Sequence, residues 1–390
     1  MNKKNIACGI SCCLALLVGC GGGGGGKKEN AAQAPALQST KVNVQLVNDG
    51  DPGAIPGLEL DLQTLELKTL DLGQGERWSP VPLAAGPRKL PGSAALQVAQ
   101  DLPWAVGSYT NARMDIGPHS KVLGADGQAL GPLQPAGNWI DLRPEAGGSS
   151  FPVKVNEGRT TDLVVLLETA GIQANPAHPG QYLRWPSRLR LLDRADTVTL
   201  SGKVTGPDGV GLPGIPVLAQ PLLQRVLAGA GLPERTTRTG SDGSFTLDLL
   251  SKGGVLCVTT QPVHGSQVYE FTAESFSALS RGQLDLKCQL LPAPATLHVT
   301  LPPGTNLQTD RVDLLRTVDL SSGKVNVLAR TAFAEASSHQ QVTFQGIAPG
   351  NYYLKRTRYT VDTHGKPSAA PWAASPALTI GPGTSTHAAP

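Results

Sequence analysis

The sequence carries little charge and no strong excess of either sign. Charged residues make up 16% of its 390 residues, and 33 Lys and Arg against 30 Asp and Glu leave a formal net charge of +3. Nucleic-acid binding needs clustered Lys and Arg that neutralise phosphates, and no such excess is present. We therefore expect no nucleic-acid partner.

The familiar catalytic and metal-binding motifs are also missing. The 7 histidines stand singly, without the His-x-x-x-His or His-Glu-x-x-His spacing that brings two ligands to one metal. There is no Gly-x-Ser-x-Gly elbow and no Gly-x-x-x-x-Gly-Lys-Ser/Thr phosphate loop. We expect no enzyme, no cofactor and no metal, although a carboxylate pair for glycoside hydrolysis depends on a distance that the sequence does not give.

What the sequence does have is a distinctive N-terminus. Lys3 and Lys4 precede an apolar segment from Ile6 to Val18, which is shorter than the about 20 residues of a membrane span. A basic start, a short apolar stretch and small residues at its end are typical of a secretory signal. The segment leads into Leu17, Val18, Gly19 and Cys20.

These four residues resemble the lipobox of bacterial lipoproteins. The resemblance implies a signal peptide over residues 1–19, cleavage before Cys20, a lipid on the Cys20 sulfur and acylation of its new amine. The alternative is an ordinary secretory signal with an incidental cysteine. The implied location is the bacterial cell envelope, and we favour the outer membrane, on its periplasmic or its surface face.

The segment after Cys20 predicts a leash. Gly21–Gly26 are consecutive glycines, and the chain continues to residue 40 with Lys, Asn, Ala, Gln, Pro and Ser. Glycine loses the most backbone freedom on ordering, so such a segment stays a flexible coil. Residues 20–40 are therefore expected to link a lipidated cysteine to the folded part of the chain.

The remaining sequence predicts an all-β protein. Its 46 Gly and 32 Pro are spread between short runs of Val, Leu and Thr, as in proteins with many short strands and frequent turns. We expect tandem β-sandwich domains of immunoglobulin- or transthyretin-like type. The expected domains cover residues 41–194, 197–291 and 294–390, the last with a frayed tail.

Local patterns refine this expectation. Within Leu58–Leu67, leucines occupy even-numbered positions up to Leu62 and odd-numbered positions from Leu65, and this switch predicts a β-bulge near Gln63 and Thr64. Asn156–Gly158 predicts a hairpin turn, and Tyr182–Leu192 a single closing strand. Short helical pieces are expected near Ala94–Gln100 and in Pro221–Gly231. Asp-Gly pairs predict turns at Asp126-Gly127, Asp208-Gly209 and Asp242-Gly243.

Two family resemblances follow from ordered motifs. The first region looks like an uncharacterised domain of bacterial lipoproteins, which implies location and fold but no chemistry; the motifs are Val42–Asp49, Leu58–Lys68, Trp78, Gly107–Asp115 and Val155–Asp162. The second is similar to the transthyretin-like regulatory domain found beside carboxypeptidases, through Val198–Val204, Asp208-Gly209, Leu212–Val217 and Thr237–Leu247. In the third, Gln345–Leu354 resembles an edge of the same sandwich superfamily, with Tyr352 packed under the Pro349-Gly350 turn.

Cysteine usage fits export. Once Cys20 and the signal are set aside, Cys257 and Cys288 remain, both within strand-like patterns. In an oxidising compartment two such cysteines form a candidate disulfide. The alternative is two buried free thiols.

Three groups of residues could bind a ligand. Asn48–Asp51 could offer oxygens to calcium, but we favour a turn held by side-chain hydrogen bonds. Trp78, Trp104, Trp139 and Trp185 could form a sugar-stacking platform, but aromatic residues are 4% of the chain and buried tryptophans are commoner. The basic cluster could meet an anionic glycan, but we favour a solvated strand face; it comprises Lys355, Arg356, Arg358 and Tyr359.

We therefore expect a non-enzymatic, lipid-anchored cell-envelope protein that presents β-sandwich modules for binding, adhesion or assembly. Its expected partners are the membrane, through the N-terminal lipid, and a glycan or an envelope protein. One alternative is a carbohydrate-binding surface lipoprotein. A second is an envelope hydrolase with its site in the first domain.

Overall fold

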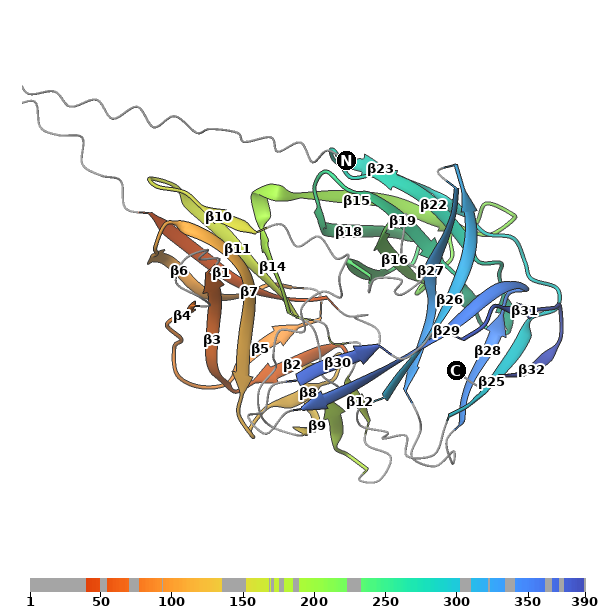
Figure 1. Ribbon diagram of the computed structural model, residues 1–390, viewed down its shortest axis with the longest axis horizontal. Helices are drawn as coiled ribbons and strands as arrows, with labels where there is room; N and C mark the ends of the chain where they lie inside the picture. The colour runs from red at the N-terminus through yellow and green to blue at the C-terminus, as the bar shows by residue number, and fades with distance from the viewer. Residues whose placement is uncertain are drawn as a thin grey trace, which may run out of the picture. The chain divides into compact units, whose positions relative to one another are not determined.

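The computed structural model (Figure 1) describes residues 40–49, 55–69, 77–92, 94–134, 152–167, 169, 172–174, 179–184, 189–222, 233–301, 310–321, 323–333, 341–361, 367–371 and 375–388. Within these residues the structure is built from strands, and its helical content is a single short 3-10 turn, η1 (Arg194–Asp196). The all-β prediction is confirmed. The described part of the chain contains no helix that is long and apolar enough to cross a membrane.

Residues 41–193, which we call region 1, form three sheets. The sheet orders are β14-β11-β1-β6, β10-β7-β3-β4 and β12-β13-β9-β8-β2-β5. Val42, Val44 and Leu46 of β1 alternate inward and share one core with Leu58 and Met114. The strands are β1 (Lys41–Asn48), β2 (Gly57–Leu60), β3 (Leu62–Thr69), β4 (Arg77–Pro80), β5 (Arg88–Pro91), β6 (Leu96–Pro103), β7 (Gly107–Ile116), β8 (Lys121–Leu123), β9 (Ala129–Gln134), β10 (Val153–Val155), β11 (Thr160–Leu167), β12 (Ile172–Ala174), β13 (Tyr182–Arg184) and β14 (Leu189–Asp193).

Region 2, residues 197–291, has a core of its own that includes Leu200, Phe245 and Val258. Phe245 and Leu247 alternate inward along β18, as the sequence predicts. The strands are β15 (Thr197–Thr205), β16 (Pro216–Pro221), β17 (Arg235–Arg238), β18 (Ser244–Ser251), β19 (Val255–Thr260), β20 (Val263–His264), β21 (Gln267–Val268), β22 (Thr272–Ser277), β23 (Gly282–Gln283) and β24 (Leu286–Lys287).

Region 3, residues 295–388, surrounds a third core that includes Leu297, Phe344 and Tyr352. Tyr352 is fully buried, and its hydroxyl donates to the Ala348 carbonyl oxygen (2.5 Å), which places the ring under the Pro349-Gly350 turn as expected. The strands are β25 (Ala295–Thr300), β26 (Asp310–Leu320), β27 (Gly323–Phe333), β28 (Gln341–Ile347), β29 (Gly350–Val361), β30 (Pro367–Pro371), β31 (Leu378–Ile380) and β32 (Ser385–Ala388).

One strand arrangement recurs in all three regions. The first strand of each region lies between an antiparallel and a parallel neighbour: β1 between β6 and β11, β15 between β18 and β23 with β24, and β25 between β28 and β32. The facing sheets also correspond, in the orders β4-β3-β7-β10, β17-β16-β19-β22 and β27-β26-β29-β30. Region 1 therefore shares the arrangement of regions 2 and 3 and adds a third sheet. The division into separate domains stays a prediction.

Several local predictions are confirmed. The register of β3 against β7 shifts between Leu62 and Thr64, at the predicted bulge. The three Asp-Gly pairs are turns, because Gly127, Gly209 and Gly243 have φ of 75°, 78° and 82°, and each Asp Oδ1 accepts the backbone N–H two residues on.

Three local predictions were wrong. Asn156–Gly158 is not a hairpin turn but a connection between two sheets, because β10 pairs with β7 whereas β11 pairs with β1 and β14. Tyr182–Leu192 is not one strand, since β13 and β14 lie in different sheets. Ala94–Gln100 is not helical; β6 pairs with β1 there, and this pairing overrides weak helix propensity. Most of the helical insertion predicted in Pro221–Gly231, residues 223–231, lies outside the described residues.

Candidate functional site

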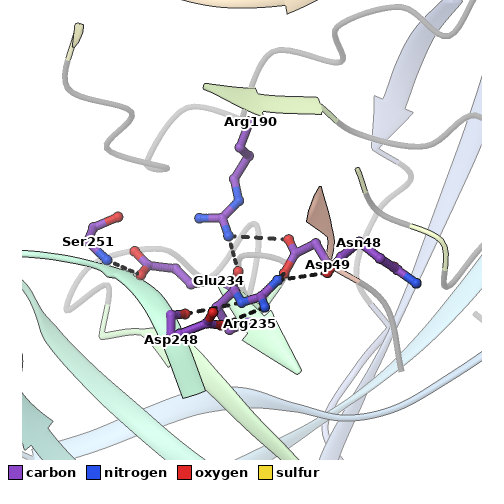
Figure 2. Close-up of polar contacts among 7 residues, drawn as sticks. All are labelled: Asn48, Asp49, Arg190, Glu234, Arg235, Asp248 and Ser251. Atoms are coloured by element: carbon purple, nitrogen blue, oxygen red, sulfur yellow. Dashed lines mark hydrogen bonds and ion pairs between the residues drawn. The ribbon is translucent and has the colours of Figure 1, made fainter. Parts of the chain in front are cut away.

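The most elaborate polar cluster lies where region 1 meets region 2. Asp49 follows β1, and its backbone N–H still donates to the Leu167 carbonyl oxygen of β11 (2.7 Å), which continues the strand ladder. Its side chain is 4% exposed and meets two guanidinium groups, at 3.2 Å from Arg190 of β14 and 3.1 Å from Arg235 of β17 (Figure 2). One buried carboxylate thus joins strands of both regions.

Arg235 is the centre of this cluster. It donates to the Asn48 carbonyl oxygen (3.0 Å) as well as to Asp49, and its Nη2 bonds Asp248 Oδ1 at 2.7 Å. Burial alone lowers the pKa of Arg235, but attraction by Asp49 and Asp248 outweighs it and raises the pKa above its ordinary value. The guanidinium therefore stays charged inside the protein.

Two backbone features complete the junction. Arg190 Nη2 donates to the Glu234 carbonyl oxygen, and Glu234 Oε2 accepts the Ser251 N–H at 3.0 Å (Figure 2).

A β-bulge at Leu249 also contributes to this junction. The register of β18 against β15 shifts between Leu247 and Leu250, where Leu249 has a φ of 55°. A β-bulge bends a strand and redirects its side chains, and Leu249 here packs against region 1. Its apolar partners are Val47, Val164, Leu166 and Leu192.

A second junction, between regions 2 and 3, is mainly apolar. The β26–β27 hairpin is longer than its region 2 counterpart, since β26 and β27 have 11 residues each and β16 and β17 have 6 and 4. Val312 and Leu314 belong to the region 3 core, whereas the distal residues pack on region 2. This second cluster comprises Leu222, Cys257, Phe271, Ala273, Val318, Leu320, Val325 and Val327.

Amide and cation contacts fix the second junction. The Gln220 side chain, 2% exposed, donates to the Leu328 carbonyl oxygen (2.9 Å) and accepts its N–H (2.7 Å). Gln261 Nε2 donates to the Gly346 carbonyl oxygen at 2.7 Å. The Arg316 guanidinium lies 5.0 Å from the Phe271 ring centroid, within cation–π range.

The cysteines predicted as a disulfide are free thiols in the structure. Leu256 and Val258 of β19 face the region 2 core that contains Cys288, so Cys257 between them points to the opposite face, toward region 3. The thiols therefore lie on different sides of one sheet. Burial raises the pKa of Cys257 to about 12 and raises that of Cys288 as well.

The other candidate ligands have different outcomes. In the candidate calcium site Asn48–Asp51, the Asp49 carboxylate forms ion pairs with two arginines and is not available to calcium. The Asn48 Oδ1 accepts a hydrogen bond from Thr169 at 2.6 Å. Residues 50 and 51 lie outside the described residues. No group of three or more His, Cys, Asp or Glu among the described residues is placed to hold a metal. Two members of the predicted tryptophan platform, Trp139 and Trp185, also lie outside the described residues.

The basic cluster of region 3 is not a solvated face. Lys355 is 4% exposed and Arg356 is fully buried, although adjacent residues of a strand point to opposite faces of its sheet, so both faces of β29 are covered at this point. Arg358 and Tyr359 belong to the same strand, but their side chains lie outside the described part. The preference for solvent exposure was wrong for Lys355 and Arg356.

Sequence patterns did not indicate the Asp49 junction. Asp49 was singled out as part of a turn, but no sequence motif connects it with Arg190, Arg235 or Asp248, which lie on other strands. Chemically, each charge is balanced by another, and the cluster provides no activated nucleophile. The sites predicted at Leu17–Cys20 lie outside the described residues.

Comparisons with known proteins add little to this description. No family model matches the chain, and no curated protein is significantly similar to it. Among solved structures, the Bacillus anthracis TIE protein aligns at 12% identity and a TM-score of 0.20 over 90% of this chain and 50% of its own. A streptococcal ancillary pilin aligns at 12% identity and a TM-score of 0.21 over 89% of this chain and 98% of its own. A DUF3823 family protein from Parabacteroides merdae aligns at 12% identity and a TM-score of 0.19 over 47% of this chain and 98% of its own.

The chain thus spans half the length of the first of these proteins. Alignments with such low TM-scores carry no argument about function, and the two family resemblances stay predictions. The class that the structure itself defines is an all-β protein with a repeated sandwich-like strand arrangement and two buried junctions.

Proposed function

We propose that this chain is a non-enzymatic, lipid-anchored protein of the bacterial cell envelope, which presents β-strand modules as a binding surface. The anchor is Cys20, and the glycine-rich residues 21–40 are the leash. The observation that carries the proposal is the pair of buried junctions. They join three similar strand assemblies in succession, as expected of a protein that holds a surface at a distance from a membrane.

The junction chemistry favours presentation over catalysis. Removing one partner from a buried ion pair leaves an uncompensated charge, at a cost of about 3–5 kcal/mol. Separating regions 1 and 2 at this junction is therefore costly, and the two regions are held together. A hydrolase would need carboxylates that can reach a substrate, whereas Asp49 is 4% exposed and held by two arginines.

Metabolic labelling tests the anchor. Cells expressing the full chain or its variants would be fed an alkyne fatty acid, and the purified protein would be examined by fluorescence and intact mass. We expect the natural chain and Cys13→Ser to take up label and to lose residues 1–19. Cys20→Ser should take up no label and retain its signal.

Cys13→Ser is a matched control because it removes a cysteine from the same segment without touching the lipobox. Fatty acid on Cys20→Ser would contradict the proposal, as would an unmodified thiol on Cys20 of the natural chain.

A further inference from the structure

The outer face of the sheet β10-β7-β3-β4 in region 1 combines an aromatic ring with positive charge. Leu65 and Leu67 of β3 and Met114 of β7 point into the core, so the alternate residues Glu66, Lys68, Asn111 and Arg113 lie on the outer face. Trp78 of the edge strand β4 stands directly opposite Lys68. The ring therefore borders charged side chains from neighbouring strands.

Trp78 is held by cations. The Arg113 guanidinium lies 4.4 Å from the centroid of its ring and the Lys68 ammonium 5.9 Å, both within the range of cation–π attraction. The Trp78 side chain is half-buried and Lys68 is 9% exposed. The arrangement fixes the indole on the sheet and leaves part of it in contact with solvent.

Arg113 keeps binding capacity. Its Nε forms an ion pair with Glu66, and the side chain is 40% exposed. Its Nη1 and Nη2 groups form no hydrogen bond to the described residues. Guanidinium groups bind carboxylates through two parallel N–H donors. Glu66 thus orients the guanidinium, while its outer edge can still accept an anion.

A comparison between regions supports a binding role for this face. The corresponding sheet of region 2, β17-β16-β19-β22, uses its outer face to receive the β26–β27 hairpin of region 3, through Cys257 of β19. The same face in region 1 carries Lys68, Trp78 and Arg113, with the exposed Lys154 on β10. Its two carboxylates are already engaged, since Glu66 pairs with Arg113 and Asp115 accepts a hydrogen bond from Thr64. This chemistry favours an anionic partner with an apolar ring face over an apolar hairpin.

We propose that this face, made of Lys68, Trp78, Arg113 and Lys154, binds an acidic polysaccharide. A uronic acid carboxylate accepts hydrogen bonds from Arg113 Nη1 and Nη2, and the C–H face of the sugar packs on the exposed part of Trp78. Lys68 and Lys154 add positive potential. The inference deepens the proposed binding function by naming a ligand class, and it does not depend on the lipid anchor.

Binding measurements on the full chain in detergent test this. The probes are polygalacturonate and its fully methyl-esterified form, which has the same backbone without the carboxylate charge. We expect the natural chain to bind polygalacturonate about tenfold or more tightly than the ester, because a hydrogen bond to a charged group contributes about 1.5–3 kcal/mol. Arg113→Gln should abolish this preference, and Trp78→Ala should weaken binding to both polymers.

Lys121→Gln is the matched control. Lys121 is a cation of region 1 with a side chain that is 45% exposed, and it pairs with Glu59; both residues lie on the sheet β12-β13-β9-β8-β2-β5, outside the proposed binding face. This variant should bind like the natural chain. Circular dichroism verifies folding, and Trp78→Phe replaces Trp78→Ala if the latter fails to fold.

Equal affinity for both polymers, or unchanged binding by Arg113→Gln, would overturn the proposal. Binding of polyglutamate without binding of polygalacturonate would overturn it in favour of an acidic protein partner. Loss of Cys20 labelling would refute only the anchor.

Discussion

The two junctions of this protein solve the same problem with different chemistry. Between regions 1 and 2, Asp49 balances Arg190 and Arg235, and a small apolar cluster around Leu249 accompanies these ion pairs. Between regions 2 and 3, the hairpin β26–β27 extends its apolar residues onto Cys257, and Gln220 pairs with the backbone of Leu328. The first junction depends on charge balance, whereas the second depends on shape and neutral hydrogen bonds, with one cation–π contact from Arg316 to Phe271.

This difference has a consequence for specificity. Apolar contacts are non-directional and tolerate exchange of side chains of similar volume. A buried ion pair tolerates no loss of one partner, because the remaining charge has left water without compensation. The first junction should therefore be the more sensitive to single substitutions, even though its apolar cluster has fewer members.

The largest effect is expected at Asp49. Replacing it with Ala leaves Arg190 and Arg235, whose side chains are 11% and 10% exposed, without their shared carboxylate. We expect Asp49→Ala to lower the free energy of unfolding by about 3–5 kcal/mol, measured by urea denaturation.

Asp248→Ala is the matched control, because Asp248 also pairs with Arg235 but is 51% exposed. Exposed ion pairs contribute about 0–1 kcal/mol, so this variant should remain close to the natural chain. Equal losses for the two variants would show that burial of Asp49 is not what makes the junction sensitive.

A smaller effect is expected at Gln220. Its side chain satisfies both backbone groups of Leu328, and Gln220→Ala would leave this buried donor and acceptor unpaired. We expect a loss of about 1–3 kcal/mol in the same assay, together with faster hydrogen exchange at the Leu328 amide. Gln283→Ala, at an exposed glutamine of region 2, should change neither quantity. Unchanged exchange at Leu328 would contradict the role of Gln220 in this junction.

Much of the architecture could be predicted because it depends on neighbouring residues. Alternation along Val42–Leu46 and the Asp-Gly turns are local, and both are present in the structure. The parity change at Gln63 is local too, and it marks a real bulge. Patterns of this kind are visible in a few residues of sequence, whatever the rest of the chain does.

Strand partners and junctions were not visible in the same way. Nothing near Asn156–Gly158 indicates that β10 and β11 join different sheets, because partners are chosen by the whole core. Arg190 and Arg235 are 141 and 186 positions from Asp49, so their meeting has no local signal. Lys355 and Arg356 were misjudged because their charge suggests exposure, whereas burial depends on whether each face of the sheet is covered, which the local sequence does not show.

The smallest effect at neutral pH, and the sharpest test of the apolar junction, is expected at Cys257. Burial raises the pKa of its thiol from 9.0 to about 12, so the folded state keeps the proton that the unfolded state releases. The unfolded state then binds fewer protons above about pH 9, and stability must fall as pH rises from there toward pH 12.

Urea denaturation between pH 7 and pH 11 measures this dependence in the natural chain and in Cys257→Ala. The variant retains Cys288, whose pKa is also raised, so the difference between the two curves isolates Cys257. We expect the natural chain to lose stability more steeply above pH 9, while both have a shallow dependence below it. Parallel curves would mean that Cys257 reaches water in the folded state, and that the region 3 hairpin does not seal the outer face of β19.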